Sequence, residues 1–224
     1  MKQAFKKGLI SAVIKSLINS FNKFKFHRSG QISLDNQIGR WIELLSSLEN
    51  INHIVEIGTW NGRGSSRAIV SGVLKKSKIN NSFIEVVGLE SDLNYVHKAK
   101  KYLKKYKFFK IIYGSLVRYE ELDNSELTEN EMKWWHNDAM NLTNAPDVLS
   151  RIPKQIDLLI LDGGEFSTYA EFHLLDNRIK QFLILDDTHT RKCKKLNEEL
   201  KKRSDYQIIF ESKERNGTSV FLKR

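Results

Sequence analysis

Short apolar segments that alternate with helical patterns limit the possible folds of this chain more than any other feature. Five segments have the length and composition of buried strands: residues 51–57, 83–89, 108–113, 156–161 and 182–185. Helical patterns of apolar residues lie before, between and after them, at residues 35–49, 65–76, 92–105, 168–177 and 190–203. This alternation predicts an α/β fold in which a doubly wound sheet is covered by helices on both faces.

The last part of the sequence predicts a hairpin. Residues 206–211 and 218–222 have strand patterns, and Asn216-Gly217 lies between them as a turn signal. We therefore expect a mostly parallel, seven-stranded sheet that ends in an antiparallel C-terminal hairpin. Such a hairpin is unusual in nicotinamide dehydrogenases, which argues against that class of enzyme.

The charge of the chain divides it into two parts. The formal charge is +10, and residues 1–30 contain seven basic side chains and no acidic one, so the remaining residues carry only +3. We expect a basic amphipathic helical leader over residues 1–30 and one domain over residues 31–224. Three interpretations of the leader stay open: it packs against the domain or a second copy, it lies in a membrane interface, or it is an organelle presequence. We expect a cytoplasmic protein, peripheral to the membrane if the leader binds there.

Composition excludes two further classes. Cys193 is the single cysteine, so the chain has neither a disulfide framework nor a zinc site built from several thiolates. The sequence contains no run of about 18 uncharged apolar residues, so it predicts no membrane span.

Residues 114–150 interrupt the alternation and are long for a connection between strands. The stretch is acidic at first and then contains Trp134, Trp135 and His136. Segments of this length often form a lid or a binding loop, and we expect short helices in it, one near residues 144–151. The two tryptophans are equally consistent with a platform for the face of a sugar and with anchors for the packing of the lid.

A glycine-rich turn follows the first predicted strand, at the sheet edge where doubly wound proteins bind ligands. Gly58, Gly62 and Gly64 permit a tight turn and a close approach of ligand to backbone, and the helix that starts at Ser65 directs free N–H groups toward the ligand. The spacing Gly-x-x-x-Gly-x-Gly differs from the Gly-x-Gly-x-x-Gly of dinucleotide-binding proteins.

Two polar residues end the next strands. Glu90 is suited to accept hydrogen bonds from both ribose hydroxyls of a nucleoside; the alternative is a surface acid or a helix cap, a role that Asp92 fits better. Ser115 either lies near an adenine or is a turn residue.

Three carboxylates follow the fourth and fifth strands, those of Asp162, Asp186 and Asp187. Without a cation, carboxylates at adjacent strand ends repel one another and raise one another's pKa values. Mg²⁺ accepts such a set of oxygen ligands. The alternative is that one acid is buried and hydrogen-bonded while the others cap helices, but for the doublet together with Asp162 we favour the metal.

These motifs resemble those of class I S-adenosylmethionine (SAM)-dependent methyltransferases over residues 35–224. The residues that carry the resemblance are residues 55–65, residues 87–90 and the terminal hairpin. Residues 161–168 and 185–188 resemble the corresponding motifs of the metal-dependent sugar O-methyltransferases of the macrocin O-methyltransferase kind. The resemblance implies a Rossmann-like fold, a SAM molecule and a metal ion.

The resemblance also implies roles for individual residues. SAM is expected to contact the glycine-rich loop and the neighbouring strand ends, namely Glu56, Gly58, Thr59, Trp60, Gly62, Gly64, Ser65, Glu90, Ser115 and Asp162. Asp162, Asp186 and Asp187 match the metal ligands. Gly164 stands where relatives often carry another aspartate that serves as the base, so Glu165 and His189 are the local candidates for this role, ahead of His136 and His173.

The sequence therefore predicts a SAM-dependent O-methyltransferase, assisted by Mg²⁺, that methylates a hydroxyl of a sugar or glycan precursor. The metal would bind adjacent acceptor hydroxyls and lower the pKa of one of them. The alternatives are an RNA methyltransferase and a non-catalytic, membrane-associated protein that retains the fold. The expected partners are a small-molecule or glycan acceptor, a second copy of the chain and a membrane surface contacted by the leader; nucleic acid is not expected, because the catalytic part is nearly neutral.

Overall fold

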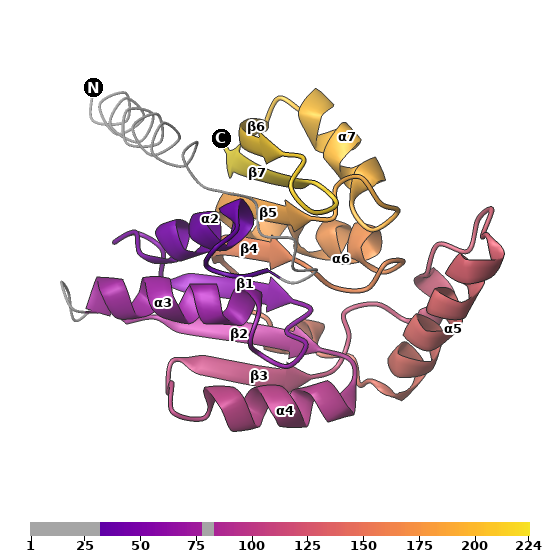
Figure 1. Cartoon of the computed structure of the whole chain (residues 1–224), viewed down its shortest axis with the longest axis horizontal. Helices are drawn as coiled ribbons and strands as arrows, with labels where there is room; N and C mark the ends of the chain where they lie inside the picture. Colours follow the sequence, from indigo (N-terminus) through magenta and orange to yellow (C-terminus); the bar gives the residue numbers. More distant parts are fainter. Residues whose placement is uncertain (1–31, 78–82) are drawn as a thin grey trace.

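The structure, a computed structural model, describes residues 32–77 and 83–224. The leader that the sequence predicts lies outside these residues. The described part contains a seven-stranded sheet with strand order β3-β2-β1-β4-β5-β7-β6 (Figure 1). The strands are β1 (His53–Ile57), β2 (Glu85–Glu90), β3 (Phe109–Tyr113), β4 (Ile156–Leu161), β5 (Ile179–Asp186), β6 (Tyr206–Ser212) and β7 (Thr218–Lys223).

The pairing of the strands confirms the predicted fold class. β1 to β5 pair in parallel, whereas β7 pairs antiparallel with both β5 and β6. Chain order reverses between β1 and β4, which is the topological switch point of a doubly wound sheet. Ligands of such sheets bind beyond the carboxyl ends of the strands at this point.

The helices of the described part are α2 (Gln37–Ser46), α3 (Ser65–Ser77), α4 (Leu93–Leu103), α5 (Glu129–Asn144), α6 (Thr168–Leu175) and α7 (Lys194–Lys202). Asp92 caps α4 through hydrogen bonds from the backbone N–H groups of Asn94 and Tyr95, as the sequence predicts. None of the helices in residues 32–77 and 83–224 is long and apolar enough to cross a membrane.

The two faces of the sheet bury separate apolar clusters, because successive side chains of a strand point to opposite faces. Val55 of β1 lies in register with Val87 and Leu159, and all three belong to the cluster under α6 and α7. The adjacent Ile54 belongs to the cluster under α2 and α3, which also contains Trp41. Burial on both faces explains why these strands are continuously apolar in the sequence.

The segment over residues 114–150 agrees with the prediction in part. Short 3₁₀ helices occur at Tyr119–Glu121 and at Leu149–Arg151, the second within the expected range, but most of the segment is one helix of 16 residues, α5, that was not expected. A capping box between Thr128 and Glu131 starts α5 and satisfies its first N–H groups. α5 lies at the side of the molecule toward which β1 to β4 point (Figure 1), so the insertion adjoins the expected ligand site.

Candidate active site

A cleft of about 290 Å³ lies at the carboxyl ends of β1 to β4. Five of the predicted cofactor-binding residues line it: Gly58, Trp60, Glu90, Ser115 and Asp162. Asp138, Asn141 and Leu142 of α5 form part of its wall. The structure therefore brings together the strand ends that the sequence singles out and adds one face of the insertion.

Gly58 is the position where the loop after β1 meets β4 most closely. Its φ angle is +86°, and a Cβ atom placed on it would lie 2.1 Å from the carbonyl oxygen of Asp162. Only glycine combines this left-handed conformation with such a close approach. The loop therefore passes tightly over the switch point and exposes its backbone to the cleft.

Glu90 is fixed by the loop that it faces. The backbone N–H of Trp60 donates to Glu90 Oε2 at 2.7 Å, and the N–H of Asp92 donates to Glu90 Oε1 at 2.9 Å. Burial raises the pKa of Glu90, while these two hydrogen bonds act in the opposite direction. Each carboxylate oxygen accepts more than one hydrogen bond, so Glu90 can also accept from a ligand with two adjacent hydroxyls.

The other predicted residues of this region make contacts within the protein and do not face the cleft. Glu56 is fully buried and accepts a hydrogen bond from the Ser66 hydroxyl at 2.6 Å, and burial raises its pKa to about 7. Thr59 donates to the Leu89 carbonyl, and Gly62 packs against Leu103. None of Glu56, Thr59, Gly62, Gly64 and Ser65 is among the residues that line the cleft.

Ser115 lines the cleft but uses its hydroxyl locally. Its Oγ donates to the carbonyl of Val117 at 2.8 Å and accepts from the Val117 N–H at 3.2 Å. The side chain therefore stabilises the turn after β3.

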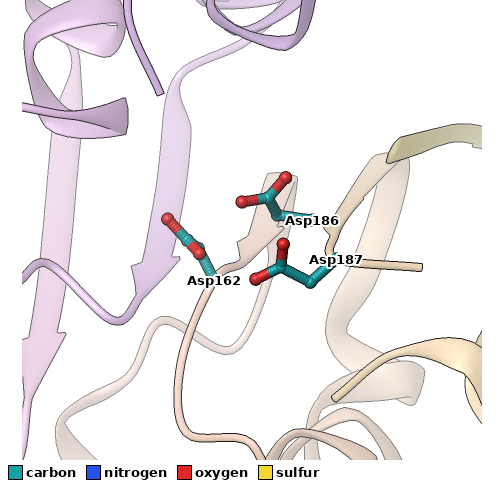
Figure 2. A group of neighbouring side chains, drawn as sticks. All are labelled: Asp162, Asp186 and Asp187. Atoms are coloured by element: carbon teal, nitrogen blue, oxygen red, sulfur yellow. The ribbon is translucent and has the colours of Figure 1, made fainter. Parts of the chain in front are cut away.

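The three aspartates converge as the sequence predicts. Figure 2 shows their carboxylates pointing toward one another from the ends of β4 and β5, and one oxygen of each lies within 4.8 Å of the others. The structure adds two cations that the sequence does not single out. Lys192 Nζ lies 3.0 Å from Asp162 Oδ1 and 2.6 Å from Asp187 Oδ2, and Arg215 Nη2 lies 2.8 Å from Asp186 Oδ2.

The electrostatic environment differs between the members of the triad. Burial, together with the charges of Asp162 and Asp187, raises the pKa of Asp186 to about 8. The pKa of Asp187 is lowered, because the Lys192 ammonium and the Asn216 amide outweigh its own burial. The neighbouring carboxylates in turn raise the pKa of Lys192 against the effect of its burial.

Asp138 of α5 brings a further carboxylate to the cleft. Asp138 Oδ2 has no hydrogen-bond partner among the described residues, and the backbone N–H groups of Phe166 and Glu165 lower the pKa of this carboxyl. Burial raises its pKa to about 6. A Cβ atom on Gly164 would lie 2.9 Å from this Oδ2, so Asp138 fills the space that a side chain at position 164 would enter.

Glu171 of α6 also lines the cleft and is buried. Its Oε2 lacks a hydrogen-bond partner among the described residues. Burial is the main cause that raises its pKa to about 8, and the charges of Asp138 and Glu90 add to it.

The predicted bases lie outside the cleft. Glu165 is half-buried, accepts from the backbone N–H of Lys192 at 3.2 Å and lines a neighbouring cavity of about 510 Å³. His189 is exposed and lies against Gly217 of the hairpin turn. The ring of His136 contacts the Met132 carbonyl within α5, and His173 lies near Glu199.

Comparison with known proteins gives the fold. No protein-family model matches the chain, and no curated protein sequence matches it. Among solved structures, a methyltransferase from Geobacter sulfurreducens is similar at a TM-score of 0.58 and 15% identity, over 99% of this chain and 94% of that one. An O-methyltransferase from Bacillus cereus, solved in complex with SAH (S-adenosylhomocysteine), is similar at a TM-score of 0.56 and 13% identity, over 96% and 90%.

A third similar structure is the O-methyltransferase from Streptomyces achromogenes involved in tomaymycin synthesis, solved in complex with SAM. Its TM-score is 0.54 at 13% identity, over 86% of this chain and 82% of that one. At these identities the likeness establishes the fold, a Rossmann-like methyltransferase fold, and not the reaction.

Proposed function

We propose that the cleft binds SAM and that the chain transfers its methyl group to a hydroxyl oxygen of an acceptor. The observation that carries this proposal is the link between Glu90 and the glycine-rich loop, through the Trp60 N–H, at the edge of a methyltransferase fold. The solved relatives that contain SAM or SAH support the same ligand.

The cleft offers a suitable surface for each part of SAM. The backbone of the loop at Gly58 would receive the methionine part, and the remaining lone pairs of Glu90 would accept from both ribose hydroxyls. The adenine would lie beside the turn held by Ser115. These assignments are the ones that the resemblance implies for residues lining the cleft.

The reaction is a direct displacement. A bond forms between the acceptor oxygen and the methyl carbon while the bond from this carbon to sulfur breaks, and the bonding electrons stay on sulfur, so that the sulfonium becomes the neutral thioether of SAH. The acceptor proton goes to a base. We assign this role to Asp138, because this residue lines the cleft, its buried Oδ2 has no hydrogen-bond partner among the described residues, and a pKa of about 6 keeps it ionised at neutral pH.

For the acceptor, we retain a sugar or glycan precursor. Asp138, Asn141 and Asp162 line the same cleft and give it hydrogen-bonding groups for several hydroxyls. Trp135 packs against the apolar core and anchors α5, whereas Trp134 is 55% exposed and is available as a platform for a sugar face.

The Mg²⁺ that the sequence predicts stays untested, and the side chains present do not fit it. The three carboxylates have the right chemistry for a divalent ion, but the Lys192 ammonium lies between two of them and Arg215 pairs with the third. We therefore derive no step of the reaction through a metal. A role of the leader at a membrane or in a homo-oligomer also stays a prediction.

The charge of the cleft disfavours the RNA methyltransferase alternative. Five acidic side chains line it, those of Glu90, Asp92, Asp138, Asp162 and Glu171, and the ionised ones would repel a phosphate backbone. The non-catalytic, membrane-associated alternative predicts no methyl transfer, and failure to bind SAM would favour it.

The test is transfer of labelled methyl from SAM to a panel of simple sugars and catechols by the full-length chain. We expect label in a base-stable ether product and formation of SAH. Tight binding of SAM without transfer to any acceptor would favour the non-catalytic alternative, and label in RNA would favour the nucleic-acid one.

A further inference from the structure

We infer that the ammonium of Lys192 is the resident cation of the acidic triad, so that this chain neither needs nor admits a divalent ion at Asp162, Asp186 and Asp187. This inference concerns the triad alone and holds whether or not the cleft binds SAM. It rests on the contacts of Lys192, on those of Arg215, and on the way in which the segment around Lys192 is held.

Lys192 connects the same strand ends that a metal ion would connect. Its Nζ contacts Asp162 after β4 at 3.0 Å and Asp187 after β5 at 2.6 Å. Only 8% of its side chain is exposed. The ammonium thus lies inside the triad, in direct contact with two of its three members.

A divalent ion would compete with this ammonium for the same oxygens. Mg²⁺ requires ligands at about 2.0–2.1 Å in near-octahedral geometry, and the lone pairs that face inward from Asp162 and Asp187 already accept from Lys192. The ion and the ammonium would also repel each other, and this repulsion is strong because the site is shielded from bulk water.

The third member of the triad has its own cation. Asp186 is fully buried, and its Oδ2 accepts from Arg215 at 2.8 Å. Arg215 comes from the turn between β6 and β7, so a different part of the chain provides this second positive charge. The acidic group is therefore compensated by side chains from two separate segments.

The backbone around Lys192 is held in place beside the triad. The Lys192 N–H donates to Glu165 Oε1 at 3.2 Å, and the following Cys193 is fully buried. The preceding Arg191 is held by Glu131 Oε1 at 3.1 Å and by the Ser125 carbonyl at 3.0 Å. Because both neighbours are fixed, the backbone of Lys192 stays within reach of the triad.

The test uses Mn²⁺ as the probe and follows free Mn²⁺ by electron paramagnetic resonance, in the absence of SAM and of any acceptor. The wild-type chain, Lys192→Met and Lys192→Arg are compared with the control Lys194→Met, which removes an exposed lysine of the same segment. Removal of one unit charge in contact with two carboxylates is expected to tighten Mn²⁺ binding by Lys192→Met at least ~10-fold. Lys192→Arg and Lys194→Met should bind as weakly as the wild type.

Two results would overturn the inference. One is stoichiometric Mn²⁺ binding by the wild type that Asp187→Asn abolishes; the other is a folded Lys192→Met variant that binds no better than the wild type. If Lys192→Met does not fold, Lys192→Gln is tested by thermal unfolding with and without Mn²⁺. A rise in Tm with Mn²⁺ for Lys192→Gln alone supports the inference, and an equal response of variant and wild type contradicts it.

Discussion

Replacing Glu171 with glutamine should stabilise the protein at alkaline pH and flatten the dependence of its stability on pH. Glu171 is only 4% exposed, and its Oε2 lacks a partner among the described residues. Burial raises its pKa from 4.5 to about 8, with smaller contributions from the charges of Asp138 and Glu90. The Ser167 hydroxyl acts in the opposite direction.

The sign follows from proton binding. The folded-state pKa lies above the unfolded one, so between these two values the folded protein keeps a proton that the unfolded chain has released. The contribution of Glu171 to the free energy of unfolding is complete below the pKa that this residue has in the unfolded chain. It falls by about 1.4 kcal/mol per pH unit as the pH rises toward the pKa in the folded protein. From about pH 5 to about pH 8 the loss from this one group is about 4 kcal/mol. Glutamine has nearly the same shape and does not titrate, so Glu171→Gln lacks this loss.

The assay is urea unfolding of the wild type and Glu171→Gln at several pH values in this range. The quantity of interest is the difference in unfolding free energy at each pH, because contributions of other groups cancel in it. Glu198→Gln, which changes an exposed glutamate of α7, sets the background. A difference between wild type and Glu171→Gln that stays constant within about 1 kcal/mol from pH 5 to pH 8 would refute the reasoning.

Three further predictions concern the site and its surroundings. Asp138→Asn should lower the methyl-transfer rate by about 10²–10⁴-fold and remove the loss of rate that we expect for the wild type below pH 6; an unchanged pH–rate profile would exclude Asp138 as the base. Arg191→Ala should speed hydrogen exchange of residues 123–131, because Arg191 contacts Asp123, Ser125, Glu126 and Glu131, and equal exchange in both proteins would contradict this. Transfer should keep its full rate in EDTA, since Lys192 provides the cation of the triad; loss of activity that Mg²⁺ restores would show otherwise.

The parallel sheet could be predicted because its strands are buried on both faces and are therefore continuously apolar. The ends of individual helices and strands are predicted less accurately. The predicted second strand starts at Phe83, but this side chain is 72% exposed and β2 begins at Glu85. The predicted last helix starts at residue 190, whereas turns occupy residues 188–193 and α7 begins at Lys194.

The length of α5 does not follow from the acidic and aromatic composition of residues 114–150, which predicts only short helices. Thr128 and Glu131 form the spacing of a capping box, which is visible in the sequence and would have indicated one helix that starts at this point.

The acidic members of the site could be predicted from their position after strands, but their partners could not. Lys192 lies in the run Arg-Lys-Cys-Lys-Lys, and nothing local separates it from the exposed Lys194 and Lys195. Its burial arises only when β4, β5 and the following segment meet. Asp138 and Glu171 are likewise helical residues whose neighbours are set by tertiary packing.

The central claim, that the cleft holds SAM, is tested most directly by calorimetric titration of the full-length chain with SAH. We expect one equivalent of binding, with an affinity that Glu90→Gln reduces about 10–100-fold, because the amide replaces an oxygen that accepts from a backbone N–H and is proposed to accept from a ribose hydroxyl. The control Glu85→Gln, at the other end of β2, should bind as the wild type does. Absence of binding by the wild type, or equal affinity of the wild type and Glu90→Gln, would contradict the account.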